Sequence, residues 1–91
     1  EKVKSKKIGP VALRSEVIQH NLSNDLLNKL IVDIYNQYPI NDLINFHLKK
    51  RKILKNTTLN KIEYNRLNNF LKRKGFYWDS ILAVYNEWGI L

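Results

Sequence analysis

Residues 66–88 have the sequence RLNNFLKRKGFYWDSILAVYNEW, which is typical of two amphipathic helices with a short break between them. In its first part, Leu67, Phe70 and Leu71 fall on one side of a helix with 3.6 residues per turn, and polar residues take the other side. Gly75 is predicted to end this helix, because glycine readily adopts the left-handed conformation that closes a last turn.

The second helix of this stretch is expected to begin near Ser80, with Asp79 as its N-cap. Its apolar side chains recur at the helical spacing i, i+3, i+4 and i+7, as Ile81, Val84, Tyr85 and Trp88. Two amphipathic helices joined by a tight turn must bury their apolar sides against each other and against a third element. The stretch therefore predicts a small all-α fold.

Helical periodicity continues through the rest of the chain, and with a short basic helix end at the N-terminus it predicts five to six helices in all. The further helices are expected at about 10–20, 24–35, 40–54 and 60–74. Asn21 is the expected stop of the first of these, and either Ser23 or Asn24 caps the second. Asn60 and Glu63 are spaced to form a capping box at the start of the last.

The predicted core follows from the same periodicity. The side chains expected to be buried are Leu13 and Val17 with Ile18 as a further candidate, then Leu27, Leu30, Ile31 and Ile34, then Ile40, Ile44 and Leu48 with Leu54 at the edge. Phe46 and Ile53 are expected on the opposite face of the helix at 40–54, among lysines. Such an apolar pair indicates a second neighbouring helix or a contact with a partner.

An internal repeat becomes visible when the chain is shifted by 54 residues, which brings LRSEVIQHNLSNDLLNKLIVDI over LNNFLKRKGFYWDSILAVYNEW. In this register the stop at Asn21 meets Gly75. Local signals that recur in register predict one structural unit used twice. We therefore expect a partial three-helix repeat at residues 1–38, with the end of a first helix and two further helices, and a complete C-terminal three-helix repeat at 39–91.

Positive charge is concentrated in the middle of the chain, whose net charge is +8. Residues 43–74 hold ten Lys or Arg and a single acid, whereas residues 1–42 hold six bases against five acids and residues 75–91 hold two acids and no base. Such a segment favours a polyanionic partner, which would be nucleic acid, an acidic protein groove or a membrane surface. A solvated, lysine-rich surface is the open alternative.

Composition excludes several classes of protein. No apolar run approaches the length of a membrane-spanning helix, and the N-terminal EKVKSKK lacks the apolar region of a signal peptide. The absence of cysteine excludes disulfides and thiol catalysis. Because no methionine occurs, even at position 1, we expect the chain to be a piece of a longer protein.

Two segments resemble the RecX family. KSKKIGPVALRSEVIQHNLSNDLLNKLI is similar to the part of RecX proteins in which a basic helix end and Gly-Pro precede an I/L-R-x-E-L helix, and LNNFLKRKGFYWDSILAVYNEW is similar to the closing repeat, L-x-x-x-L-x-R-R-G-F-x-x-x-x-I. The residues that fit are Leu13, Arg14, Glu16 and Val17 in the first segment, and Leu67, Leu71, Arg73, Gly75, Phe76 and Ile81 in the second. Asn21 and Leu22 stand where the family usually has Gly-Ile.

This resemblance implies an all-α protein of tandem three-helix repeats, of which this chain would be the last two. It further implies a cytoplasmic, non-enzymatic regulator that binds the RecA recombinase and its filament on single-stranded DNA, and dampens ATPase and strand-exchange activities in recombination and SOS-linked repair. Direct DNA binding is a second expected contact. Neither a cofactor, a membrane nor a small-molecule substrate is expected, and a general basic DNA-binding helical module is the alternative.

The candidate site for RecA or DNA is a basic cluster, whose side chains would contact phosphates without reading the sequence. Its members are Lys49, Lys50, Arg51, Lys52, Lys55, Lys72, Arg73 and Lys74, and the wider cluster includes Lys61 and Arg66. The four consecutive bases at 49–52 are expected to point all round a helix, so that at most three can meet one partner. The opposing interpretation is a solubilising face with charges that suit helix C-termini.

Aromatic residues beside this cluster have two interpretations. Phe76 and Trp88 are predicted core residues. Tyr77 and Trp78 are expected to be partly exposed, where they would either stack nucleic-acid bases or close a small core. His47 lies on an apolar stripe and is predicted to be packed and hydrogen-bonded.

Neither a metal site nor a catalytic site is predicted. His20 and His47 lie on different helices without cysteine or a spaced pair of acids. Asp25 and Asp79 occupy equivalent helix starts, where capping explains both. A helix-turn-helix protein would need polar, base-reading side chains on the helices that follow Asn21 and Gly75, and these helices are rich in Leu and Ile. A purely scaffolding repeat array is the remaining alternative.

Overall fold

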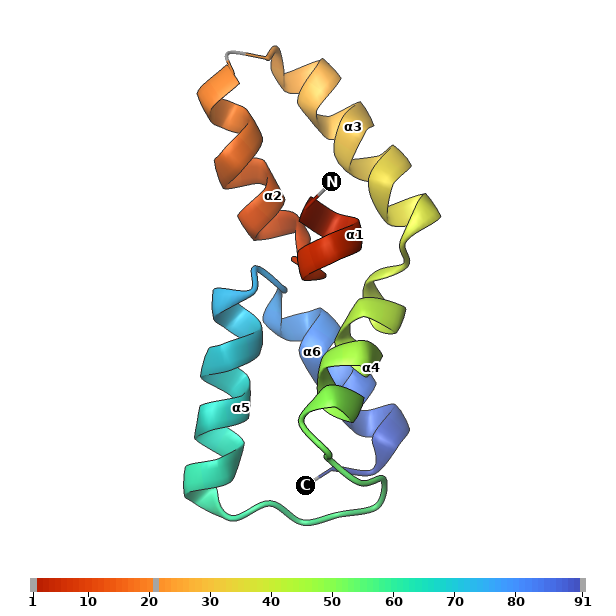
Figure 1. The fold of residues 1–91 in the computed structure, drawn as a ribbon, viewed down its shortest axis with the longest axis vertical. Helices are drawn as coiled ribbons and strands as arrows, with labels where there is room; N and C mark the ends of the chain where they lie inside the picture. The colour runs from red at the N-terminus through yellow and green to blue at the C-terminus, as the bar shows by residue number, and fades with distance from the viewer. Residues whose placement is uncertain (1, 21, 91) are drawn as a thin grey trace.

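The computed structural model describes residues 2–20 and 22–90, and this part of the chain is all-helical (Figure 1). Its elements are α1 (Lys2–Lys6), α2 (Pro10–Val17), a 3₁₀ turn (Ile18–His20), α3 (Asn24–Gln37), α4 (Ile40–Lys50), α5 (Lys61–Arg73) and α6 (Trp78–Trp88). The predicted all-α fold with five to six helices is confirmed. None of the described helices is long and apolar enough to cross a membrane.

The molecule is elongated, with extents of 43 × 22 × 22 Å. Helices α1, α2 and α3 form one end and α4, α5 and α6 the other, with α1 next to the junction (Figure 1). The radius of gyration is 14.1 Å, whereas a compact domain of this length has about 12 Å. Two three-helix groups placed end to end account for the larger value, while the predicted division into repeats at 38/39 stays a prediction.

Two of the predicted helix starts are confirmed. The Ser23 side chain accepts a hydrogen bond from the backbone N–H of Leu26 at the start of α3. Asn60 and Glu63 form the capping box of α5, with the Glu63 N–H 2.8 Å from Asn60 Oδ1 and the Asn60 N–H 3.3 Å from Glu63 Oε1. Each bond satisfies a backbone donor that a helix start otherwise leaves without a partner.

The predicted start of the last helix is wrong. Helix α6 begins at Trp78, and its N-cap is Tyr77, which makes no side-chain cap hydrogen bond. Asp79 therefore lies in the first turn, as Asp25 does in α3. Neither carboxylate is the N-cap, but both lie at the positive end of the helix dipole, which explains acids at these two positions.

Helix α4 ends at Lys50 and not at residue 54, because Lys52 adopts a left-handed conformation with φ of 62°. The Lys52 N–H donates to the carbonyl of Lys49, and the Ile53 N–H donates to the carbonyl of Leu48, each with a donor–acceptor distance of 3.0 Å. This pair of bonds is the Schellman motif, which ends a helix. As a result Leu54 is 72% exposed, against the prediction, and Ile53 packs on the core whereas Phe46 is exposed.

The core lies mainly between α4, α5 and α6. The buried apolar side chains are Val3, Ile8, Leu13, Leu27, Leu43, Ile44, Leu48, Leu67, Leu71, Phe76, Ile81, Val84, Tyr85, Trp88 and Ile90. Trp88 and Phe76 are thus core residues, as predicted, whereas Ile18 is 60% exposed. Helix α2 gives way to the 3₁₀ turn at Ile18, and this change of period turns its side chain away from the core.

Two glycines allow the turn after α1 to pack against the turn after α5. Gly75 has φ of +96° and ends α5, as predicted, while the predicted stop at Asn21 lies outside the described residues. A Cβ atom on Gly9 would lie 2.5 Å from the Gly75 carbonyl oxygen, and one on Gly75 would meet the backbone of Ala12. The backbones can approach this closely because neither residue has a side chain. This contact therefore fixes the position of the two ends of the molecule relative to each other.

Candidate functional site

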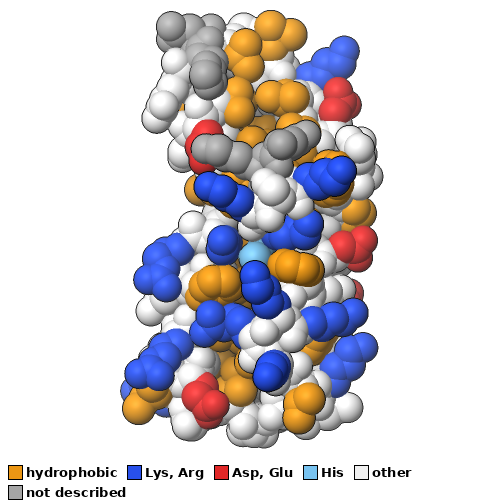
Figure 2. Space-filling model, viewed as in Figure 1, with side chains coloured by type: hydrophobic (Ala, Val, Ile, Leu, Met, Phe, Trp, Pro, Cys, Tyr) orange, Lys and Arg blue, Asp and Glu red, His pale blue; other side chains and the backbone are white. Residues whose placement is uncertain are grey.

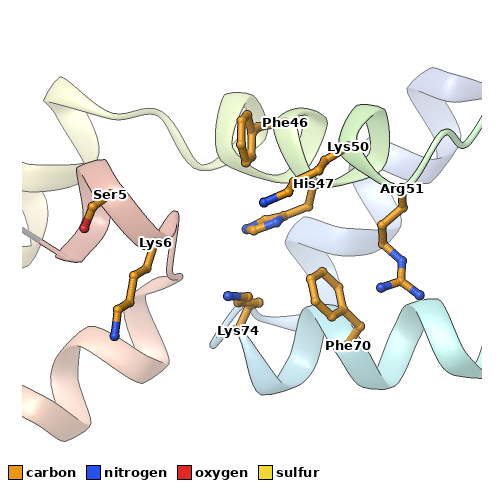
Figure 3. A pocket seen from close by; sticks show the side chains of 8 residues that line it. All are labelled: Ser5, Lys6, Phe46, His47, Lys50, Arg51, Phe70 and Lys74. Atoms are coloured by element: carbon orange, nitrogen blue, oxygen red, sulfur yellow. The ribbon is translucent and has the colours of Figure 1, made fainter.

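A basic cavity of about 510 Å³ opens where α1, the end of α4 and the end of α5 come together (Figure 3). Its lining residues are Ser5, Lys6, Phe46, His47, Lys50, Arg51, Phe70 and Lys74. Figure 2 shows lysine and arginine side chains gathered around a histidine on this face of the molecule. Three helices that are distant in the sequence therefore contribute cations to one hollow.

The end of α4 places Lys50 and Arg51 in the cavity. Lys50 is the last residue of the helix and Arg51 its C-cap, where the helix dipole favours positive charge. The left-handed Lys52 then turns the chain away. The four bases at 49–52 therefore do not continue round a helix as predicted, and only the middle two line the cavity.

The end of α5 places Lys74 on the opposite side of the cavity. Lys74 is the C-cap of α5, directly before the left-handed Gly75. Its carbonyl accepts a hydrogen bond from the Gly9 N–H at 2.7 Å, and the Gly75 carbonyl accepts one from the Val11 N–H at 2.9 Å. These bonds hold the backbone of the turn, and the Lys74 side chain is half-buried in the cavity.

The third side of the cavity comes from α1, which is held in place by a histidine. The Lys7 carbonyl, directly after α1, lies 2.8 Å from His47 Nε2. Because a carbonyl can only accept, His47 carries its proton on Nε2 and donates it to this oxygen. One residue further on, the Ile8 carbonyl accepts a hydrogen bond from the Tyr35 hydroxyl at 2.9 Å. The His47 bond keeps the end of α1, with Lys6, beside α4, and the Tyr35 bond joins the same segment to α3.

His47 forms a neutral floor to the cavity. The side chain is only 4% exposed, and this burial is the main reason why its pKa lies below the usual value. The charges of Lys74, Lys50 and Lys7 lower the pKa further, while the hydrogen bond to the Lys7 carbonyl opposes them. The positive charge of the cavity therefore comes from lysine and arginine, and the histidine has the packed, hydrogen-bonded role that was predicted.

Two phenylalanine rings hold cations in place. The Arg51 guanidinium carbon lies 4.5 Å from the centre of the Phe70 ring. The Nζ atoms of Lys7 and Lys50 lie 5.2 and 5.8 Å from the centre of the Phe46 ring, which is 41% exposed. Cation–π contacts of this kind are worth about 0.5–1 kcal/mol at exposed sites. They orient the cations but do not neutralise their charge.

A second hollow of about 270 Å³ continues the first along α5. Its lining residues are Arg51, Arg66, Asn69, Phe70 and Arg73. Arg51 and Phe70 line both hollows, so that the two hollows adjoin at this pair. We call the two hollows together the basic groove.

The basic groove is suited to binding anions. Its lining includes six basic side chains, namely Lys6, Lys50, Arg51, Arg66, Arg73 and Lys74, and no acid is among the lining residues of either hollow. Arginine binds phosphate oxygens with two parallel hydrogen bonds, and lysine acts as a flexible point charge. Phosphate groups are therefore the ligands that this arrangement fits.

The structure separates the predicted site residues into two sets. Those that line the groove are Lys50, Arg51, Arg73 and Lys74. Those outside it are Lys49, Lys52, Lys55 and Lys72. Lys72 lies over Trp78, with Nζ 4.9 Å from the ring centre, and Lys55 lies 5.6 Å from that of Trp88. Tyr77 and Trp78 are partly exposed, as predicted, but neither lines the groove.

Two basic residues of the groove were not among the predicted site residues. Lys6 belongs to the basic N-terminal run, which was interpreted as a helix end. It reaches α4 only through the tertiary contact between the Lys7 carbonyl and His47. Arg66 was assigned to the wider cluster. Its spacing of seven residues from Arg73 places both on one face of α5, and this is the signal that could have selected it.

No family model, curated protein or solved structure matches this chain. Within residues 2–20 and 22–90, no group of three or more His, Cys, Asp or Glu side chains is placed to hold a metal ion. The basic groove is the feature of the described residues that is suited to binding a ligand.

Proposed function

We propose that this chain is a non-enzymatic binding module that contacts the phosphate backbone of DNA through the basic groove. We propose further that its target is the filament of a RecA-type recombinase on single-stranded DNA, which it regulates negatively as RecX proteins do. The observation that carries the proposal is the convergence of six cations from three helices on one groove without an acid.

The backbone of a nucleic acid is the polyanion that fits an open, extended groove. Cations line the groove from both α4 and α5, so that successive phosphates would meet charge on both sides. Contacts of this kind supply affinity but carry no sequence information. They release counter-ions, and the affinity therefore depends steeply on salt.

The resemblance to RecX supports the filament as the target. A stack of helical repeats forms an extended binding surface. The 43 Å length of the molecule and the position of the groove at the contact between its two ends suit a module that lies along a filament. A module in that position would hinder ATP turnover and strand exchange by occupying the DNA and the RecA surface beside it.

The test is fluorescence anisotropy of the labelled chain against RecA-coated single-stranded DNA, RecA alone and naked single-stranded DNA, each at several salt concentrations. The variant Lys50→Gln/Lys74→Gln removes two groove charges. Lys49→Gln/Lys55→Gln is the matched control, because it removes the same charge outside the groove. The slope of log affinity against log salt is negative. Its magnitude should decrease by about 0.7 per lost phosphate contact for the groove variant, and stay the same for the control.

Preference for the coated filament, lost only in the groove variant, is the expected result. Binding to naked DNA alone would support the alternative of a general basic DNA-binding module. Equal losses in the two variants would contradict the groove as the site. A chain that binds none of the three targets would overturn the proposal.

A further inference from the structure

The larger hollow of the basic groove differs from a simple phosphate-binding surface because aromatic rings form much of its wall. Phe46, His47 and Phe70 all line it, and the centre of the His47 ring lies 5.5 Å from that of Phe46 and 5.4 Å from that of Phe70. A plain backbone-binding groove needs only cations. Rings beside cations are typical of sites that hold a base together with its phosphate.

We infer that this hollow takes one nucleotide with an unpaired base, with its phosphate on Lys50 and Lys74 and its base on the ring of Phe46. The inference rests on the proposed function and deepens it, because it names the unit of nucleic acid that the groove recognises. The volume of about 510 Å³ lies in the usual range of small-molecule sites, roughly 300–1,000 Å³.

The ring of Phe46 becomes available when a phosphate binds. The ring is 41% exposed, and the ammonium groups of Lys7 and Lys50 lie over it. A lysine side chain is flexible, and a charge-assisted hydrogen bond to phosphate is stronger than an exposed cation–π contact. The phosphate would therefore draw Lys50 off the ring, and a base could stack on the surface that Lys50 uncovers, while the Lys7 ammonium stays hydrogen-bonded to the Lys4 carbonyl.

The rest of the hollow is rigid enough to hold the nucleotide in one orientation. His47 is buried and is fixed by its hydrogen bond to the Lys7 carbonyl. A base inside a duplex is stacked on its neighbours and cannot offer its face to Phe46. The hollow should thus distinguish single strands from duplexes, which cations alone do not.

The test compares Phe46→Leu, which keeps an apolar side chain and removes the ring, with Tyr77→Leu, which makes the matching change at an exposed aromatic residue outside the groove. Anisotropy titrations use a labelled oligodeoxythymidine, the same strand with abasic sites, and a duplex of equal length. Phe46→Leu should weaken binding to the oligodeoxythymidine by at least about fivefold, which is the low end for loss of one stacked base. Its affinity for the abasic strand and the duplex, and all affinities of Tyr77→Leu, should stay the same.

A second variant, Phe46→Trp, keeps the result interpretable if Phe46→Leu folds poorly. Its tryptophan emission, compared with that of the unchanged chain, should be quenched by the oligodeoxythymidine and not by the abasic strand. Competition with thymidine monophosphate, against inorganic phosphate as control, distinguishes the source of the nucleotide. Competition by the monophosphate supports a free nucleotide as ligand, and its absence, with the strand still bound, supports a nucleotide within a strand.

The two proposals fail in different ways. If Phe46→Leu binds all three nucleic acids as the unchanged chain does, while Lys50→Gln/Lys74→Gln weakens all three, the nucleotide pocket is wrong and backbone binding stands. If neither variant changes any affinity, the groove is not the site and both proposals are overturned. An equal loss for single strand, abasic strand and duplex in Phe46→Leu would also contradict a role in base stacking.

Discussion

Replacing Gly75 by Ala should destabilise the protein more than the same replacement at Gly89, its other left-handed glycine. Gly75 has φ of +96°, and a Cβ atom there would overlap the backbone of Ala12. The backbone cannot yield locally, because the Lys74 carbonyl accepts a hydrogen bond from Gly9, before α2, and the Gly75 carbonyl accepts one from Val11, in the first turn of α2. The methyl group must therefore push the two turns apart.

The size of the effect follows from the parts of this contact. An alanine in the left-handed region costs roughly 1–2 kcal/mol. Separating the turns loses the bonds from the N–H groups of Gly9 and Val11, each worth about 1 kcal/mol. The sum is roughly 3–4 kcal/mol, against a free energy of unfolding of about 5–14 kcal/mol for a chain of this length. A large part of the free energy of unfolding thus depends on the absence of a side chain at Gly75.

Urea unfolding, followed by far-UV circular dichroism, measures the loss as a lower midpoint at unchanged slope. Gly89→Ala is the matched control. Gly89 also ends a helix with positive φ, but a Cβ atom there would meet mainly the side chain of Asn56. It should cost only the left-handed term of roughly 1–2 kcal/mol.

Equal losses for Gly75→Ala and Gly89→Ala would mean that the close approach of the two turns contributes nothing to stability. The double variant Gly9→Ala/Gly75→Ala provides a second check. Both changes break the same contact, so their combined cost should be smaller than the sum of the single costs. A strictly additive loss would show that the two glycines act independently.

Two further predictions concern the end of α4. Lys52 has φ of 62°, so Lys52→Gly should raise the free energy of unfolding by about 0.5–1 kcal/mol in the same urea assay, and a decrease would contradict the left-handed helix stop. His47 has a lowered pKa because it is buried, so the folded protein resists a proton that the unfolded chain takes up below about pH 6.5. The unchanged chain should therefore lose more stability between about pH 7.5 and about pH 5.5 than His47→Gln does, and equal losses would show that His47 titrates alike in both states.

Local signals in the sequence were sufficient for the helices themselves. The capping box at Asn60 and the glycine stop at Gly75 depend only on residues within one or two turns, and both are found as predicted. The end of α4 could not be predicted in the same way. A lysine in the left-handed region has no sequence signal, because this conformation is unfavourable on its own. Here it is adopted together with the Schellman hydrogen bonds, with Ile53 partly buried against the core.

The candidate site was predictable only as a composition. The excess of bases at 43–74 identified the charged segment, but half of the basic residues selected there lie outside the groove. A count of charges does not show which way each side chain points. The directions of the Lys50 and Lys74 side chains depend on where α4 and α5 end. Lys6 enters the site from a distant part of the chain, through a contact that no local pattern records.

The all-α class, the alternation of helices and stops, and the strongly basic middle of the chain follow directly from the amino-acid order, because periodicity, capping and charge act over a few residues. Which cations share the groove, and which rings lie beside them, is set by the packing of the folded chain. That outcome depends on the close approach at Gly9 and Gly75 and on the hydrogen bond from His47 to the Lys7 carbonyl. These contacts join residues far apart in the chain, and they form because packing the core brings the two ends of the molecule together.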